Sequence, residues 1–257
     1  MKAPWCEGLP IVTMPRRDTA NPVTVIYPYY ENGTFLERQL QHWATFASDL
    51  RANASLIIVD DGSPLTPAAA IMRAWKIGWK SVRTFRIDVD VPWNWIAARN
   101  IGFHHAADGW CLVTDMDHVI REETMRSVIY SDHDPGTIYA FRRLDVKEDD
   151  AAVEIHPHPN SWLMTRAMFW DVGGYDETLS GHYGTDGDWR RRCAKVAPIE
   201  ILTDVLLRYE HREDSSTTRY QRKLPADTAA VKSIVANRPG RFWRPRILSF
   251  PYHEVGW

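Results

Sequence analysis

The chain has 257 residues, of which 44% are hydrophobic and 25% charged, and its formal net charge is −2. This balance is typical of a folded globular protein and excludes a disordered chain. Because acidic and basic residues nearly cancel, net charge does not indicate a nucleic acid or an anionic membrane as partner. No stretch approaches the roughly 20 apolar residues of a membrane-spanning helix, and the first residues lack the apolar core of a signal peptide.

The three cysteines, Cys6, Cys111 and Cys193, lie far apart in the chain. This spacing fits neither a zinc site nor a compact disulfide framework. We therefore expect reduced thiols and a cytoplasmic protein, which would associate with a membrane only through its partners. The length fits one large domain.

The first half of the chain alternates between two patterns. Residues 1–22 predict an irregular, proline-rich leader, and the apolar run 23–30 predicts a buried strand. Apolar residues then recur at helical spacing between residues 36 and 50. Further strands are expected at 55–60, 81–87 and 110–115, with helices at 67–75 and 93–107. The alternation predicts an α/β fold with a mostly parallel sheet flanked by helices, in which ligands bind beyond the carboxyl ends of the strands.

The second half is less regular. Strands are expected at 137–144, 161–165 and 199–211, the last as one strand or two, and short helices at 167–171 and 189–195. An acidic insertion occupies 145–154. After residue 211 the chain becomes polar, and residues 219–246 hold eight basic residues against one acidic residue. We interpret this stretch as a solvated surface tail; a lid over a diphosphate, or a contact to an anionic acceptor, is the alternative.

The sharpest chemical feature is the pair Asp115 and Asp117 at the end of an apolar strand. In an extended segment, side chains two residues apart point to the same face, so both carboxylates could reach one ion. Hard divalent cations prefer oxygen ligands and leave positions open for phosphate oxygens. An isolated pair of this kind is common in solvated turns, so the surrounding motifs decide its meaning.

Five segments give the pair that context. In chain order they read VTVIYPYYEN, IIVDDGSP, AARNIGFHHA, CLVTDMDH and SWLMTRAMFWDVGGYDETLSGHYGTDGDWRRR. The first four resemble, in order and spacing, the first half of glycosyltransferase family 2. The fifth is similar to the second half of that family, and more so to the carboxyl-terminal segment of the β-1,4-galactosyltransferases and polypeptide N-acetylgalactosaminyltransferases.

The resemblance implies a GT-A fold, with a Rossmann-like nucleotide-binding half at 23–117, an acceptor half at 118–211 and a basic extension at 212–257. It also implies roles on the nucleotide side. Asp60 and Asp61 would face the base and ribose, near Pro28 and Tyr29 at the end of the first strand. Asp60 could equally cap its own turn, as is common in the sequence Asp-Asp-Gly-Ser.

Arg99 would lie near the nucleotide or its phosphates, although a surface arginine on a helix fits its spacing as well. In the metal site, Asp115 and Asp117 would hold Mn²⁺ or Mg²⁺, with His211 as a third ligand. A polar surface residue is the ordinary alternative for His211, and His118 is a weaker competitor. The two histidines of the HPHP run at 156–159 resemble metal ligands, but the prolines favour a stiff loop.

On the acceptor side, the resemblance implies that Asp186 is the catalytic base that deprotonates the acceptor hydroxyl. Asp186 and Asp188 also suit a helix N-terminus, where the helix dipole stabilises negative charge. Thr185 replaces the acidic residue usual at its position, which puts one acceptor contact in doubt. Further acceptor-binding candidates are Gly174, Tyr183, Asp188 and Trp162. The aromatic ones, and Trp189, could instead pack inward.

The sequence therefore predicts a metal-dependent, inverting glycosyltransferase that moves a hexose from a nucleoside-diphosphate sugar, with UDP expected, to a hydroxyl. The acceptor could be a carbohydrate, a protein, a lipid or a nucleic acid. Two alternatives stay open. One is a sugar-phosphate nucleotidyltransferase of similar fold, disfavoured because no Gly-rich phosphate loop follows the first strand. The other is an inactive domain that only binds glycans or a partner.

Overall fold

The computed structural model describes residues 5–146, 151–209, 228–240 and 243–256. Its strands are β1 (Ile11–Val12), β2 (Val23–Tyr29), β3 (Ala54–Asp60), β4 (Ser81–Ile87), β5 (Trp110–Val113), β6 (His118–Ile120), β7 (Ile138–Val146), β8 (Ala152–Ile155), β9 (Trp162–Thr165), β10 (Ile199–Tyr209) and β11 (Tyr252–Glu254). Its α-helices are α1 (Gly33–Ala44), α2 (Ser48–Asn53), α3 (Ala68–Met72), α4 (Trp95–His105), α5 (Glu122–Tyr130), α6 (Arg166–Asp171), α7 (Asp186–Val196) and α9 (Ala229–Ala236).

The described strands form one mixed sheet in the order β1-β10-β7-β9-β5-β2-β3-β4-β11, with β6 beside β10 and β8 beside β7. Strands β5, β2, β3 and β4 run parallel to one another. Strand β9 is antiparallel to both β5 and β7 and so joins this parallel set to the second half of the chain. The predicted mixed, mostly parallel α/β fold is confirmed.

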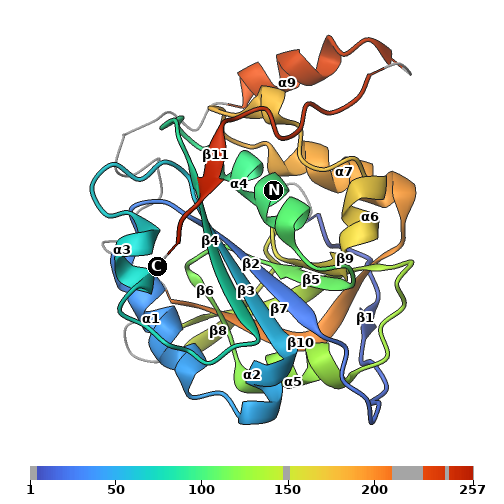
Figure 1. Cartoon of the computed structure of the whole chain (residues 1–257). Helices are drawn as coiled ribbons and strands as arrows, with labels where there is room; N and C mark the ends of the chain where they lie inside the picture. Colours follow the sequence, from blue (N-terminus) through green and yellow to red (C-terminus); the bar gives the residue numbers. More distant parts are fainter. Residues whose placement is uncertain (1–4, 147–150, 210–227, 241–242, 257) are drawn as a thin grey trace.

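Two hydrophobic layers cover the faces of the sheet, because side chains alternate along each strand. On β2, Val25 and Tyr27 face one layer, which is closed by α1, α2, α3 and α5. Ile26 faces the other layer, which is closed by α4, α6, α7 and α9. Figure 1 shows the two helix groups on opposite sides of the central strands. Both layers bury large rings, among them Trp43 and Trp189.

Several elements differ from those expected. The helix predicted over 36–50 is two helices, α1 and α2, interrupted at residues 45–47. Strand β6 and helix α5 follow the Asp115–Asp117 segment where no regular structure was predicted. Residues 199–209 form a single strand, β10, whose register with β7 shifts between Leu202 and Val205. Part of the acidic insertion forms β8, which pairs with β7.

Both predicted extensions join the domain where the structure describes them. In the leader, β1 pairs in parallel with β10. In the basic segment, β11 adds an antiparallel strand to β4, and Arg246 N–H donates to Asp176 Oδ1 at 3.2 Å. The Glu177 carboxylate accepts from the N–H groups of Leu248 and Ser249 at 2.8 and 2.7 Å. These parts are therefore packed against the domain and are not solvated tails.

No helix in the described ranges is both long enough and apolar enough to cross a membrane.

Helix α4 packs closely on β2, and Gly102 permits this approach. A Cβ atom built on Gly102 would overlap Ile26 Cγ2. We expect Gly102→Ala to lower the free energy of unfolding by about 1–3 kcal/mol, because overpacking outweighs the better helix propensity of alanine. Urea unfolding followed by tryptophan fluorescence measures the change.

Gly187→Ala is the matched control, because Gly187 is also helical but a Cβ added there would meet only the ends of arginine side chains, the nearer at 3.5 Å. Its stability should stay equal or rise by up to about 1 kcal/mol. Equal effects of the two substitutions would contradict the tight α4–β2 packing.

Candidate active site

The candidate site lies where the strand order reverses. From β2 the chain moves to β3 and β4 on one side, and then places β5 on the other side of β2. The carboxyl ends of β2 and β3 are level, with Tyr29 opposite Asp60. Ligands of open α/β sheets bind at such a switch point.

Asp60 organises the turn after β3. Its Oδ1 accepts from Ser63 N–H and its Oδ2 from Ala68 N–H, both at 2.8 Å. Burial raises the pKa of this carboxyl, although the two backbone hydrogen bonds oppose the rise. With both oxygens occupied, Asp60 fulfils the alternative role of a turn cap. Tyr29 is also structural, since its buried hydroxyl donates to Thr66 O at 2.6 Å.

Asp61 is the next residue of this turn. It is buried, as is Pro28 within β2, and its N–H donates to Tyr29 O at 2.8 Å. Gly62 has φ +77° and lies so close to the next loop that a Cβ would stand 2.7 Å from Val89 O. The turn therefore requires glycine at this position.

The Asp115–Asp117 segment is a turn, not the extended strand end that we expected. His118 N–H donates to Asp115 O at 3.0 Å, and Met116 is buried. The argument that an extended backbone aligns the two carboxylates is therefore wrong. Both side chains nevertheless stay partly exposed, at 34% for Asp115 and 27% for Asp117.

Arg99 holds Asp115 from the interior. Its guanidinium is fully buried and donates from Nη2 to Asp115 Oδ1. It lies over the rings of Trp95 and Tyr175, at 4.3 and 5.6 Å from the ring centroids. Arg99 is therefore an internal residue of α4 and not a surface arginine. Burial raises the pKa of Asp115, and the positive charge of Arg99 limits the rise.

His118 holds Asp117 in a similar way. Its Nδ1 lies 2.7 Å from Asp117 Oδ1, and Arg208 Nε lies 3.7 Å from Oδ2. Burial by itself raises the pKa of Asp117, but His118 and Arg208 outweigh it and lower the pKa overall. Asp117 is therefore an anion at neutral pH.

His158 was missed by the sequence, which indicated only a stiff loop for the HPHP run. The structure places His158 Nε2 3.5 Å from Asp115 Oδ2 and its ring 4.4 Å from the ring of His118. Its Nδ1 lies 3.1 Å from Ser161 Oγ. Burial lowers the pKa of His158 well below its usual value, which keeps the ring neutral. The HPHP run was the local signal, but the contact with Asp115 depends on how β9 packs beside β5.

The carboxylates fit half of a divalent-cation site. Each commits Oδ1 to a short hydrogen bond, whereas the contacts that Oδ2 makes with described residues are 3.5 Å or longer, to His158 and Arg208. Two oriented oxygens are thus left for a cation, as hard cations require. Among the described residues no group of three or more His, Cys, Asp or Glu side chains forms a ligand set. His211 lies outside the described residues.

The two acids of the acceptor motif have separate environments. Asp186 begins α7, is 27% exposed, and lies 3.4 Å from Arg190 Nη2. Asp188 is buried, and its oxygens contact Arg192 at 3.1 Å and Arg238 at 2.5 Å. The prediction that Asp188 binds the acceptor is therefore corrected, because two arginines already occupy it.

Trp162 and Gly174 are also structural. Trp162 is fully buried, with its ring 5.4 Å from that of Trp5, and cannot stack on a sugar. Gly174 has φ +67°, and a Cβ there would stand 2.9 Å from Trp170. Tyr183, in contrast, is 39% exposed.

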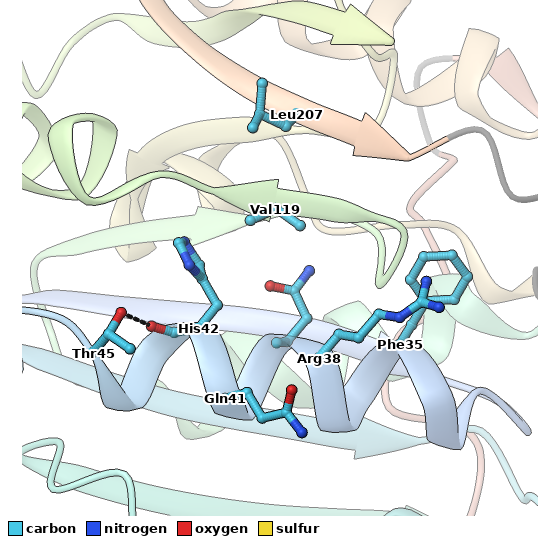
Figure 2. Close-up of a pocket in the computed structure, with 8 residues that line it drawn as sticks. Phe35, Arg38, Gln41, His42, Thr45, Val119 and Leu207 are labelled. Carbon is cyan, nitrogen blue, oxygen red and sulfur yellow. Dashed lines mark hydrogen bonds between the residues drawn. The ribbon is translucent and has the colours of Figure 1, made fainter. Parts of the chain in front are cut away.

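A cavity of about 510 Å³ lies elsewhere, between α1 and the strands β6 and β10. Figure 2 shows Arg38, His42 and Phe35 projecting from α1 toward Val119 and Leu207. It is lined by none of the predicted site residues. Of its lining residues, Gln39 donates to Met116 O and His118 O at 3.1 and 2.8 Å, beside the Asp115–Asp117 turn. We therefore do not place the donor there.

A family match covers the segments that form this site. The sequence model of glycosyl transferase family 2 matches residues 24–183, more than half of the chain. The chain belongs to glycosyl transferase family 2. The match spans the β2, β3 and β5 ends and the Asp115–Asp117 turn. Among curated proteins, none matches the chain.

Solved structures of GT-A glycosyltransferases share the fold. TarS residues 1–349 of S. aureus, in complex with UDP-GlcNAc, has a TM-score of 0.59 and 14% identity, covering 76% of this chain and 60% of that one. GalNAc-T7 with UDP, GalNAc and Mn²⁺ has a TM-score of 0.57 and 14% identity, and the alignment covers 79% of this chain and 48% of that one. The mannosyltransferase PcManGT from Pyrobaculum calidifontis, with GDP-Man and Mn²⁺, has a TM-score of 0.55 and 14% identity. The alignment covers 80% of this chain and 60% of that one.

This family 2 chain thus spans 60% or less of those solved chains. The predicted GT-A fold and family resemblance are confirmed. At 14% identity the likeness concerns the fold, so donor, cation and acceptor are argued from this chain's own residues.

The different environments of Asp186 and Asp188 can be tested by stability. Asp188→Asn should lower the free energy of unfolding by about 3 kcal/mol, because it removes a buried carboxylate that pairs with both Arg192 and Arg238. Asp186→Asn should change it by less than about 1 kcal/mol, since its ion pair is partly exposed. Chemical denaturation of both variants measures this, and similar losses in the two would contradict the assignment.

Proposed function

We propose that the chain is a metal-dependent, inverting glycosyltransferase that uses a nucleoside-diphosphate sugar, a UDP-sugar above all. The observation that carries the proposal is the Asp115–Asp117 turn, held from within by Arg99 and His118 at the switch point of the sheet. The structures of similar fold support the donor class, because TarS, GalNAc-T7 and PcManGT were solved with UDP-GlcNAc, UDP or GDP-Man.

On the donor side, Asp61 is our candidate for contact with the base and ribose, because Asp60 caps its own turn. Asp115 and Asp117 would hold the cation through the two Oδ2 atoms that lack short hydrogen bonds. Arg99 acts as a positioning residue for Asp115. Its buried place leaves it to orient the carboxylate rather than to contact the phosphates from solvent.

The charges around the turn support a divalent cation. Three arginines there face three aspartates: Arg99, Arg143 and Arg208 face Asp115, Asp117 and Asp145. Burial lowers the pKa of His158 and keeps its ring neutral. The three arginines are therefore balanced by the three aspartates, and these side chains have no net positive charge with which to bind a diphosphate. A bound Mn²⁺ or Mg²⁺ would neutralise the charge that develops on the leaving diphosphate.

On the acceptor side, Asp186 is our proposed base. The acceptor oxygen forms a bond to the anomeric carbon as the bond from that carbon to the phosphate oxygen breaks. The hydroxyl proton passes to Asp186, and the electron pair leaves with the diphosphate. A single displacement of this kind inverts the anomeric centre, so one carboxylate near the incoming oxygen is enough. The partial exposure of Asp186 leaves it open to a substrate.

Nucleotide release tests the activity without knowledge of the acceptor. A panel of UDP- and GDP-sugars is incubated with the full chain and Mn²⁺, and released nucleoside diphosphate is measured. We expect slow release from one donor, and loss of at least about tenfold when EDTA replaces the metal. Release that is indifferent to EDTA would contradict metal dependence, and silence with every donor would contradict the transferase assignment.

Asp186→Asn tests the base. The variant should lose transfer by about 10²-fold or more, because general-base catalysis contributes on that order. UDP binding, measured by calorimetry, should persist, since Asp186 lies on α7 and outside the Asp115–Asp117 turn. Asp188→Glu is unsuitable as a control because Asp188 is buried, so Glu7→Gln, on the exposed leader, serves instead. Retained turnover in Asp186→Asn would remove it from the mechanism.

A further inference from the structure

Tyr183, an acceptor-binding candidate in the sequence, forms an aromatic pair with Trp93, a residue to which the sequence assigned no role. The rings of Trp93 and Tyr183 have centroids 5.3 Å apart and are tilted by 50°. Trp93 belongs to the loop between β4 and α4, and Tyr183 to the loop that leads into α7. Of the large apolar side chains that are exposed in the described ranges, Tyr183 is the only aromatic one.

The backbone on both sides of the pair is held in unusual conformations. Trp93 has φ +49°, which is rare for a bulky residue and costs free energy. Gly181 and Gly184, which flank Tyr183, have φ +85° and +84°. A Cβ at Gly184 would stand 2.6 Å from Thr228 Cγ2, so this position has no room for a side chain. The two loops thus hold the backbone that carries the rings in conformations that few residues adopt.

A direct contact also joins the two loops. Ser180 Oγ and Asn94 Oδ1 are 2.6 Å apart. Asn94 in turn accepts the first backbone hydrogen bonds of α4, from Ala97 and Ala98 N–H at 2.9 and 3.2 Å. The helix that follows Trp93 carries Arg99, and the helix that follows Tyr183 begins at Asp186. The aromatic pair therefore lies in the chain just ahead of both functional helices.

We propose that Trp93 and Tyr183 form a stacking platform for a pyranose ring of the acceptor. This inference rests on the proposed function and names the chemistry of its acceptor as a glycan. A sugar ring has an apolar C–H face and a polar rim, which an amphipathic, partly wet aromatic surface matches. Tyr183 lies three residues before Asp186, so a sugar ring stacked there would lie in the segment that leads to the proposed base. Trp162 and Trp189, two tryptophans of the segment that contains Tyr183, are buried and cannot serve.

The test uses simple glycosides as probes: methyl β-D-glucopyranoside, methyl β-D-galactopyranoside and methyl α-D-mannopyranoside. Their binding to the full chain with UDP and Mn²⁺ is measured by saturation-transfer NMR. We expect at least one to bind, and Trp93→Ala or Tyr183→Ala to weaken it about tenfold, the effect of losing one aromatic contact. Trp93→Phe and Tyr183→Phe keep a ring and should retain affinity within about threefold.

Trp75→Ala is the matched control, because Trp75 is also a half-buried tryptophan but lies between α3 and β4, before the amino end of β4. It should leave glycoside binding within about twofold of wild type. UDP affinity, measured by calorimetry, should also stay within about twofold in Trp93→Ala and Tyr183→Ala. A tenfold loss of UDP affinity in these variants, about 1.4 kcal/mol, would overturn the proposal and assign the pair to the donor.

Two further outcomes overturn the platform: no glycoside bound by the wild type, or equal binding by the wild type and the alanine variants. These outcomes are separable from failure of the proposed function, which is scored by metal-dependent nucleotide release. Nucleotide release without glycoside binding removes only the platform. Ring-dependent glycoside binding without nucleotide release removes only the transferase and leaves a glycan-binding domain.

Discussion

The buried Arg99 connects the parts of this site. Its guanidinium holds Asp115 and packs on Trp95 and Tyr175. The next residue, Asn100, exchanges hydrogen bonds with the Tyr175 backbone at 2.9 and 2.8 Å and donates to Glu177 at 2.7 Å. Glu177 then binds the carboxyl-terminal segment. Two consecutive side chains of α4 thus tie the Asp115–Asp117 turn, the Tyr175–Glu177 segment and the carboxyl-terminal segment into one unit. A buried charge with one carboxylate partner is costly to disturb.

The same arrangement positions the two aspartates that we propose as cation ligands. One oxygen of each carboxylate is fixed, by Arg99 on Asp115 and by His118 on Asp117. The second oxygens are left with longer contacts in a partly exposed turn. Preorganised ligands of this kind bind without the entropy loss of ordering their side chains. Burial lowers the pKa of His158, so its neutral ring provides a polar contact to Asp115 without adding charge.

The sequence predicted what depends on local pattern and failed where distant segments decide. Strands β2 and β3 were found because they are almost continuously apolar. Asp188 was misassigned because its partner Arg238 comes fifty residues later. Trp162 was misassigned because composition does not show whether an aromatic ring faces solvent or the core. The extended backbone predicted around Met116 was wrong because the short turn before β6 has no strong sequence signal. The alternative role of Asp60 as a turn cap was anticipated, because it depends on backbone groups close to Asp60 in the sequence.

The central claim is that Asp115 and Asp117 together hold the cation that binds the donor diphosphate. Anomalous diffraction at the manganese edge, from a crystal of the full chain grown with UDP and Mn²⁺, tests it most directly. The account predicts one anomalous peak between these two carboxylates, in contact with the diphosphate. A diphosphate bound at the switch point without a manganese peak there, or a peak at another place in the molecule, would contradict it.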